Sequence, residues 1–392
     1  MLVSTRRVAR LFGRLVCAPF VLLLPAAPAL GQGVSETHPN ILIFVADDLG
    51  WRDTGVYGNR FIRTPNIDRL ARSGLLVRYA FGTSPQCSPS RISMLSGNYS
   101  HATRTEDLHT PLPDGVRLLP SYLQEQGYFT GMMAKTHVGP NGEKQFQWYS
   151  PQTAETFPGF LDSTATRPFF LWVAFHEPHR PYHPESVAHR HQPGRVALSP
   201  YLVDTPETRA DLVNYYDTIA HMDDAIGTML AELDRRGLRQ KTLVLFLSDN
   251  GAPFPREKGT LYDAGTRTPL VFSWPNVIRA GTVYDRGLVS TVDLTPTLLE
   301  IAGAGRRLDS IQGRSFRELL TEPAKFPGRT QVFSERNWHD CDEHQRAVRT
   351  LRFKLIRTDA YTDLPLCTAA DIGASPSFLA LRARAKAGRL TA

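Results

Sequence analysis

The chain has 392 residues, of which 42% are hydrophobic and 21% are charged. This balance leaves enough apolar material for a hydrophobic core, and the absence of repeats excludes a low-complexity or repeat protein. The formal net charge is +7, but no run of Lys or Arg indicates a nucleic-acid surface, so we expect no nucleic-acid partner. The length suits one large domain, alone or with one smaller domain.

Residues 1–31 have the pattern of a secretory signal peptide. Residues 6–14 hold four arginines and no acid, an apolar run follows at Val16–Leu24, and small residues suit cleavage after Ala29 or Gly31. The apolar run is too short for a stable membrane span. We therefore expect an exported protein, in the periplasm or outside the cell, with a mature net charge of about +3.

The first strand signal is the apolar run Asn40–Ala46, which suits a strand buried on both faces of a parallel sheet. Thr64-Pro65 then starts a helix, because Thr is a good N-cap and Pro is favoured at the first helical position. Gly74 ends this helix, and Leu75–Tyr79 can form the next strand.

The alternation of helices and strands continues along the chain. We expect helices over Leu118–Gln126 and Pro206–Arg236, and strands over Tyr128–Met133, Phe169–Phe175 and Leu243–Leu247. Such alternation predicts an α/β fold, with a large, mainly parallel sheet and helices on both of its faces.

Polar groups follow three of these strands. Asp47 and Asp48 come after the first, His176 after the fourth, and Asp249 and Asn250 after the fifth. The carboxyl edge of an open α/β sheet carries the ligand site, so we expect these side chains to meet there. The oxygen ligands Asp47, Asp48, Asp249 and Asn250 suit Ca²⁺, with Mg²⁺ as the alternative.

The pattern of the sequence changes near the C-terminal end. Gln331–Ser334 and Ala347–Thr358 look like strands of a smaller antiparallel layer, and Ala374–Ala392 looks helical. We therefore expect a catalytic domain over residues 38–325 and a C-terminal subdomain over residues 326–392.

Cys87-Ser88-Pro89-Ser90-Arg91 resembles the signal for oxidation of Cys to formylglycine. With the acidic pairs, it makes the chain resemble the type I sulfatases of the alkaline phosphatase superfamily. The resemblance implies that Cys87 becomes an aldehyde, that its hydrate is the nucleophile and a metal ligand, and that a formylglycine-generating enzyme is a partner. Ser88–Ser96 can form a helix whose N-terminus faces this charge, and Arg91 lies one turn away.

Two further segments resemble those that bind sulfate in this family. In Lys135-Thr136-His137, Lys135 would bind sulfate and His137 would accept a proton; in an extended chain the two side chains point the same way. After Asp249-Asn250, Lys258 would be the second sulfate-binding cation, with Arg256 as the alternative.

A histidine segment would supply the general acid. Phe175-His176-Glu177-Pro178-His179 resembles the family segment at the end of a strand. By this resemblance, His176 protonates the leaving atom, and His179 is a second candidate.

Several segments are most similar to the sulfamidase (heparan N-sulfatase) branch: 135–140, 249–255, 336–350 and 375–378. The similarity covers His38 to Leu390. It implies hydrolysis of an N-sulfate on glucosamine, as in glycosaminoglycan degradation, with His109 and His339 as substrate-binding candidates.

Three alternatives stay open: an O-sulfatase on sulfated glycans, a phosphate or phosphonate monoester hydrolase of the same superfamily, and a truncated relative without catalysis. The last arises because the chain stops at Ala392, before the further strand and helix that family members carry, so we expect an incomplete subdomain with an exposed edge. Cys341 and Cys367 can pair if the protein is exported. A homodimer is also left open.

Overall fold

The computed structural model describes residues 1, 38–183, 187–304, 310–359 and 368–390. The signal peptide expected over residues 1–31 lies outside this part of the chain, as does Cys367. Glu36–Ala392 form one compact unit. Among the described residues, no helix has the length and apolar character that a membrane crossing requires.

The centre of this unit is an eight-stranded mixed sheet with the order β10-β2-β9-β7-β1-β6-β4-β5. Its central strand β1 pairs in parallel with both β6 and β7, and β4 and β5 continue the parallel part, whereas β9 is antiparallel to β7 and β2. The strand bounds are β1 Asn40–Ala46, β2 Leu75–Val77, β4 Phe129–Ala134, β5 Trp148–Ser150, β6 Phe169–Ala174, β7 Thr242–Ser248, β9 Leu270–Ser273 and β10 Thr282–Tyr284.

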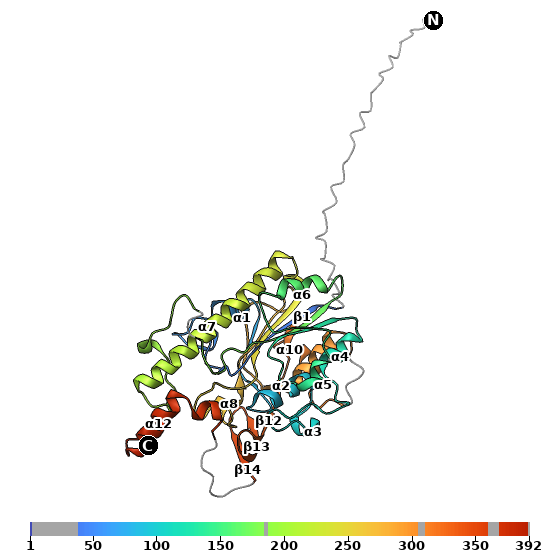
Figure 1. Ribbon diagram of the computed structural model, residues 1–392. Coiled ribbons are helices and arrows are strands. Elements are labelled where there is room, and N and C mark those ends of the chain that lie inside the picture. Colours follow the sequence, from blue (N-terminus) through green and yellow to red (C-terminus); the bar gives the residue numbers. More distant parts are fainter. Residues whose placement is uncertain (2–37, 184–186, 305–309, 360–367, 391–392) are drawn as a thin grey trace. The chain divides into compact units, whose positions relative to one another are not determined.

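Helices cover both faces of this sheet (Figure 1). The reason is visible in β1, where Ile41, Ile43 and Val45 join one hydrophobic cluster while alternate residues such as Leu42 and Phe44 join another. Helices α1 (Pro65–Arg72), α6 (Phe157–Ser163) and α7 (Pro206–Arg235) pack on the Leu42 face. Helices α2 (Cys87–Ser96), α4 (Leu119–Gln124), α9 (Leu294–Ile301) and α10 (Arg317–Thr321) pack on the other.

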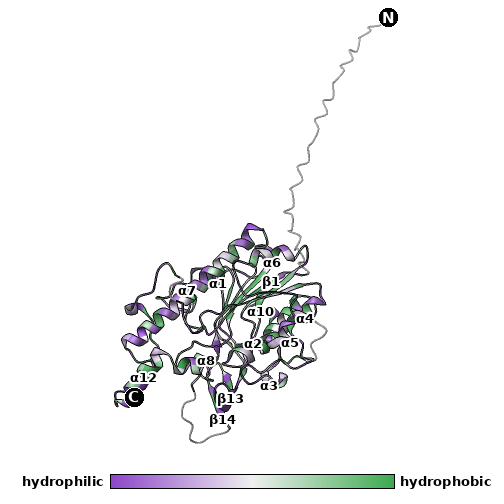
Figure 2. Cartoon of the chain, in the orientation of Figure 1, coloured by the Kyte–Doolittle hydropathy of each residue, from purple (hydrophilic) through white to green (hydrophobic). Residues whose placement is uncertain are grey.

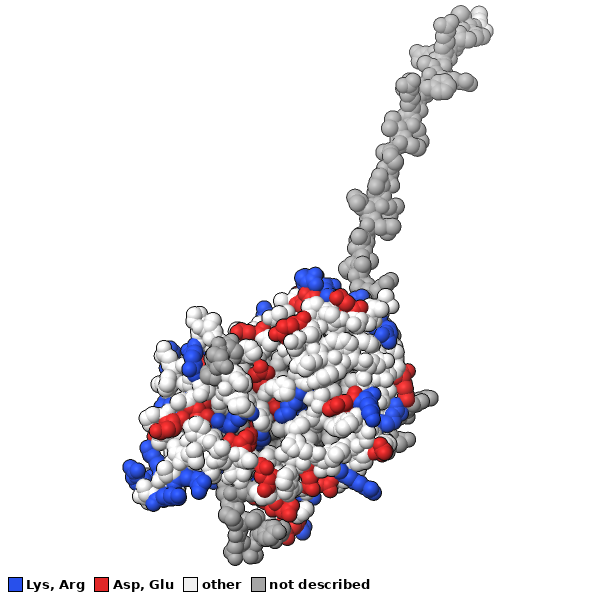
Figure 3. Space-filling model, viewed as in Figure 1, with Lys and Arg blue, Asp and Glu red and all other residues white. Residues whose placement is uncertain are grey.

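The predicted α/β architecture is therefore confirmed, and most of the expected elements begin and end within a few residues of their predicted bounds. Figure 2 shows the strands as apolar and the helices as mixed, which is the pattern that buries a sheet between amphipathic layers. On the face seen in Figure 3, basic and acidic side chains are interspersed.

The C-terminal strands form a separate antiparallel sheet with the order β12-β13-β14, which confirms the predicted small layer. Its strands are β12 Gln331–Trp338, β13 Asp342–Thr350 and β14 Lys354–Thr358. The single strand expected over residues 347–358 is wrong, because a tight turn divides it, and the Thr350 hydroxyl accepts the Phe353 amide there at 2.9 Å. The turn carries no Gly or Pro, so the sequence gives no signal for it.

Two short helices follow, α11 (Ala370–Gly373) and α12 (Pro376–Lys386). The Ser375 hydroxyl caps α12 by accepting the Phe378 amide, and the Ser377 amide donates to Asp211 on α7 at 3.3 Å. This contact places the end of the chain beside the long helix α7 (Figure 1). The other short strands and α-helices of the described residues are β3 Ala80–Phe81, β8 Arg267–Thr268, β11 Val289–Ser290, α3 Ser100–Thr103, α5 Gly139–Glu143 and α8 Asp263–Thr266.

Candidate active site

Two polar pairs meet where β1 and β7 end. The strands are parallel with Ala46 opposite Ser248, so the next residues of each strand emerge side by side at the carboxyl edge of the sheet. The Asp48 amide donates to Asp249 Oδ1 at 3.1 Å, and the Asn250 side-chain amide donates to Asp48 Oδ1 at 2.7 Å. The structure therefore brings together all four oxygen ligands expected from the sequence, including Asp47, and all four are buried.

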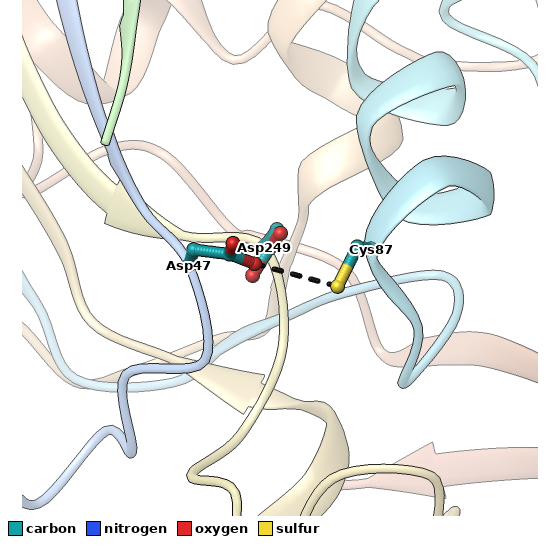
Figure 4. A group of neighbouring side chains, drawn as sticks. All are labelled: Asp47, Cys87 and Asp249. Carbon is teal, nitrogen blue, oxygen red and sulfur yellow. Dashed lines mark hydrogen bonds between the residues drawn. The ribbon is translucent and has the colours of Figure 1, made fainter. Parts of the chain in front are cut away.

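Cys87 is the first residue of α2 and points at this group (Figure 4). Its Sγ lies 3.4 Å from Asp47 Oδ1 and 3.8 Å from Asp48 Oδ1. One ligand atom from each of Asp47, Cys87 and Asp249 falls within 4.8 Å of the others. Burial raises the pKa of the thiol well above its ordinary value, so an unmodified Cys87 would be a neutral thiol rather than a thiolate.

Arg91, one turn further along α2, offsets the negative charge of the Asp47 and Asp249 carboxylates. Its Nε donates to Asp249 Oδ2 at 2.8 Å, and a terminal nitrogen lies 3.5 Å from Asp47 Oδ1. Burial would raise the pKa of Asp47, but Lys135 and Arg91 outweigh it and hold this pKa well below its usual range. Burial keeps the pKa of Asp249 at about 6 despite Arg91, because Asp47 and Asp48 also repel its charge.

Two lysines complete the charge balance. Lys135 Nζ contacts Asp47 Oδ2, and Lys258 Nζ lies 2.7 Å from Asp48 Oδ2. Burial alone would lower the pKa of Lys258, but Asp48 more than offsets it and raises this pKa well above the ordinary value. Both ammonium groups are therefore charged beside the carboxylates. Arg256 does not take the place of Lys258, since its guanidinium lies over the Tyr262 ring.

The expectation that Lys135 and His137 point the same way along an extended chain is wrong. β4 ends at Ala134, and both Ala134 and His137 have positive φ, at 59° and 52°, so the segment turns. His137 instead lies beside His109, with 4.8 Å between the ring centroids, and its buried Nδ1 has no hydrogen-bond partner among the described residues. Burial, reinforced by Lys135, lowers the pKa of His137 to about 2, so its imidazole is neutral.

The histidine segment after β6, residues 175–179, lies beside the expected metal ligands at the ends of β1 and β7. The Asp47 amide donates to the Glu177 carbonyl at 2.9 Å, and Arg180 binds Asp211 with two hydrogen bonds of 2.6 and 2.8 Å. His179 Nε2 lies 3.7 Å from Asp48 Oδ2, and its Nδ1 contacts the Arg180 carbonyl. His176, the residue expected to act, is exposed and lines a cavity of about 500 Å³ beside Asp47 and Lys135.

Asp371 on α11 is a site residue that sequence reasoning missed. Its Oδ2 lies 3.0 Å from Lys258 Nζ and 3.8 Å from His179 Nε2. Burial would raise the pKa of Asp371, but Lys258 lowers it below the ordinary value. A lone Asp far along the chain from the other site residues carries no signal, except that it precedes the Ser375-Pro376-Ser377-Phe378 segment.

The two substrate-binding candidates, His109 and His339, contact residues next to those of the site. The His109 amide donates to Ser88 Oγ at 2.8 Å, which fixes its loop against α2. His339 is buried, with Nδ1 2.9 Å from Asp340 Oδ2, and burial followed by the charge of Lys258 lowers its pKa. Cys341 is disulfide-bonded, and Cys367, its expected partner, lies outside the described residues.

The donor set fits a hard divalent cation. The carboxylates of Asp47, Asp48 and Asp249 and the amide of Asn250 offer only oxygen, which suits Ca²⁺ or Mg²⁺. Asn250 Oδ1 is buried, yet no group in the described part of the chain donates a hydrogen bond to it. A bound cation would satisfy this orphaned oxygen, because a buried polar atom is otherwise costly to leave unpaired.

Two family models match this chain. The sulfatase model covers residues 39–150 and 147–304, and the model of the N-sulphoglucosamine sulphohydrolase C-terminal region covers residues 256–377. Human N-sulphoglucosamine sulphohydrolase is 33% identical over 411 residues, with 92% of this chain and 81% of that protein covered. An ulvan-active sulfatase of Formosa agariphila is 27% identical, with coverages of 82% and 61%.

Solved structures share the fold. A structure of Ps i-CgsB in complex with k-i-k-neocarrahexaose matches with a TM-score of 0.69, 23% identity and coverages of 84% and 85%. A protein in complex with its substrate D-glucosamine-2-N,6-O-disulfate matches with a TM-score of 0.68, 20% identity and coverages of 83% and 90%. The chain belongs to the sulfatase family, whose members hydrolyse sulfate esters or sulfamates.

Proposed function

We propose that this sulfatase removes the N-sulfate group from glucosamine, as a sulfamidase of glycosaminoglycan degradation. The main support for sulfatase chemistry is the position of Cys87. It belongs to a Cys-x-Pro-x-Arg segment, and its Sγ lies 3.4 Å from the buried carboxylate of Asp47. The relative named N-sulphoglucosamine sulphohydrolase, at 33% identity over most of the chain, supports the choice of substrate.

The chemistry needs a nucleophile and positive charge beside an anionic sulfate. Formylglycine formed from Cys87 would supply a hydrated aldehyde as the nucleophile, and Ca²⁺ or Mg²⁺ held by Asp47, Asp48, Asp249, Asn250 and residue 87 would offset the repulsion between anions. Every other part of the reaction falls to side chains of this protein.

These side chains have distinct tasks. Lys135 and Lys258 are charged and converge from different loops, so together they can bind the sulfate oxygens and orient sulfur toward residue 87. Arg91 holds the Asp47 and Asp249 carboxylates in place. The neutral imidazole of His137 can accept a proton near residue 87, since its Nδ1 is unpaired among the described residues.

We assign the proton donor for the leaving nitrogen to His179 rather than His176. Nδ1 of His179 meets only a carbonyl, which can only accept, and Nε2 faces the carboxylates of Asp48 and Asp371. His179 Nε2 therefore lies beside the carboxylates of the site, which is where a proton donor to the leaving nitrogen is required. His176 lines the same cavity as Asp47, Lys135 and His179, and it would contact the sugar.

The proposal extends to the protein's surroundings. Residues 1–31 would export the chain to the periplasm or the cell exterior, and a formylglycine-generating enzyme would modify Cys87. The described residues give no support for or against the homodimer.

Sulfate release from N-sulfoglucosamine tests the substrate, measured beside 6-O-sulfated glucosamine and an aryl phosphate. Protein whose residue 87 is shown by mass to be the aldehyde should release sulfate from the N-sulfate. Release from the O-sulfate alone would replace the sulfamidase by an O-sulfatase, an alternative that relatives named N-acetylgalactosamine-6-sulfatase at 28% identity keep open. Release from the phosphate alone would favour the phosphate monoester hydrolase.

A further inference from the structure

A second cavity lies on the same edge of the sheet as the active site. It has a volume of about 530 Å³, which is within the range of small-molecule sites. Its walls come from the loop that follows β1, from residues 197–201, and from the loop that follows β7. None of the residues assigned above to the metal ligands or to sulfate binding lines it.

Three arginines line this cavity, namely Arg52, Arg256 and Arg267, together with three acidic residues, Asp53, Glu257 and Asp263. None of the three arginines has an ion-pair partner anywhere in the part of the chain that the structure describes. Arg52 and Arg256 are exposed and lie over the rings of Trp51 and Tyr262, at 4.8 and 4.9 Å from the ring centroids. Their guanidinium groups stack on these rings, and no side-chain hydrogen bond joins either of them to the residues that the structure describes.

Arg267 is the most informative of the three. Only 8% of it is exposed, it packs 3.5 Å over Trp51, and a terminal nitrogen donates to the Arg78 carbonyl, yet its buried Nε has no hydrogen-bond partner in the described structure. Stacking on Trp51 offsets part of the desolvation. A buried charge without an ion pair is nevertheless costly, although Asp263 nearby favours it, and an anionic ligand would offset that cost.

The rest of the wall suits a sugar rather than a bare ion. The Tyr201 hydroxyl donates to Glu257 Oε1 at 2.6 Å, and the Ser199 hydroxyl lies 3.4 Å from the same oxygen. Burial, followed by repulsion from Asp53, raises the pKa of Glu257 to about 8, so its carboxyl group can donate a hydrogen bond at neutral pH without repelling an anion. Hydroxyl and carboxyl groups of this kind match sugar hydroxyls, and the faces of Trp51 and Tyr262 match sugar C–H groups.

We propose that this cavity is a second saccharide-binding site, which takes one acidic sugar residue through its sulfate or carboxylate group. Arg52, Arg256 and Arg267 bind the acidic group, while Glu257 and Tyr201 bind hydroxyls. The site goes beyond the proposed hydrolysis and does not depend on which sulfate the enzyme removes. It would give the protein a hold on a polyanionic glycan next to the catalytic residues, since Glu257 directly precedes Lys258.

Calorimetric titration of the full chain carrying Cys87→Ala tests the site without turnover. The probe is a disaccharide of a uronic acid and 6-O-sulfated glucosamine. We expect Arg52→Ala with Arg256→Ala to remove one binding site from the titration, or to weaken it by about tenfold or more. Ala197→Trp, which narrows the cavity without changing charge, should do the same. Arg279→Ala, which removes an exposed arginine elsewhere, should change nothing.

Two outcomes would overturn the proposal. Titration curves that are the same in the double variant and in Arg279→Ala would show that the cavity does not bind the disaccharide. Inorganic sulfate that binds the cavity as tightly as the disaccharide would show a simple anion site. Arg267→Met separates a binding role from a structural one: we expect loss of binding with no fall in melting temperature, whereas a structural arginine would lower it. Sulfate release by the same variants in the Cys87 background reports separately on hydrolysis.

Discussion

Arg91 allows three carboxylates to share one buried site. Its guanidinium is fully buried and reaches Asp249 at 2.8 Å and Asp47 at 3.5 Å, so it offsets the repulsion among Asp47, Asp48 and Asp249. Its place one turn after Cys87 on α2 is what makes this contact available. The Arg of the Cys-x-Pro-x-Arg segment thus contacts the carboxylates of Asp47 and Asp249.

Replacing Arg91 by Met should abolish sulfate release and lower the free energy of unfolding by about 3–5 kcal/mol, because buried carboxylates lose their counterion. Urea unfolding at a fixed Ca²⁺ concentration measures the stability. The matched control is Arg117→Ala, since Arg117 forms an exposed pair with Glu125 at 2.7 Å and should change stability by less than about 1 kcal/mol. Equal stability of the two variants would contradict the role given to Arg91.

Glu257 makes stability depend on pH in a defined direction. Its pKa of about 8 in the native state exceeds the unfolded value of about 4.3, so the native state holds a proton that the unfolded state releases in this interval. Stability should therefore fall as the pH rises from about 4.3 to 8, by up to about 1.4 kcal/mol per unit from this group. The free energy of unfolding of Glu257→Gln, measured with urea, should fall less steeply with pH over this interval. The control Glu322→Gln changes an exposed carboxyl group, so its stability should depend on pH as that of the original protein does. If the stability of Glu257→Gln had this same pH dependence, Glu257 would not be the group responsible.

At the scale of elements, the segment after β6 depends on α7 for its position. Arg180 is partly buried and binds Asp211 bidentately, and Asp211 also accepts the Ser377 amide at the start of α12. One carboxylate therefore fixes both the loop that carries His179 and the C-terminal helix.

Asp211→Ala should destabilise the protein by about 3–5 kcal/mol, because the Arg180 guanidinium loses its partner. It should also speed amide exchange across Pro376–Lys386, measured by hydrogen–deuterium exchange with mass spectrometry. Asp204→Ala is the control, because Asp204 pairs with Arg209 at the exposed surface and the loss of this pair should leave stability nearly unchanged. Unchanged exchange in α12 of the Asp211 variant would mean that other contacts hold the helix.

The elements that sequence predicts well are those whose periodicity is strong. The buried strands and α7 carry continuous or helical apolar patterns, and their carboxyl-edge positions brought Asp47, Asp48, Asp249 and Asn250 together as expected. The turn at residues 351–353 has no Gly or Pro, and the positive φ values at Ala134 and His137 fall on residues that do not favour them, so local pattern could not reveal either feature. Asp371 reaches the site through tertiary packing alone, and no spacing along the chain encodes that contact.

For the whole molecule, the proposed metal joins segments that are distant in sequence. Its ligands would come from the ends of β1 and β7 and from the start of α2, so bound metal stabilises the native state over the unfolded chain. A strong chelator should therefore lower both sulfate release and the melting temperature, with recovery on adding Ca²⁺; metal at about 100 times its Kd contributes about 2.7 kcal/mol. In Asn250→Ala, the difference in melting temperature between chelator and added Ca²⁺ should be smaller. An unchanged melting temperature and rate in the chelator would argue against the metal.

Residue 87, as formylglycine, is the nucleophile of the proposed reaction. The most direct measurement is sulfate release from N-sulfoglucosamine by protein made with a formylglycine-generating enzyme, compared with Cys87→Ala and Cys87→Ser made in the same way. We predict that both variants keep the fold, by melting temperature, and lose turnover to the limit of detection, since neither Ala nor Ser yields the aldehyde. Turnover by either variant at more than a trace of the original rate would contradict the account.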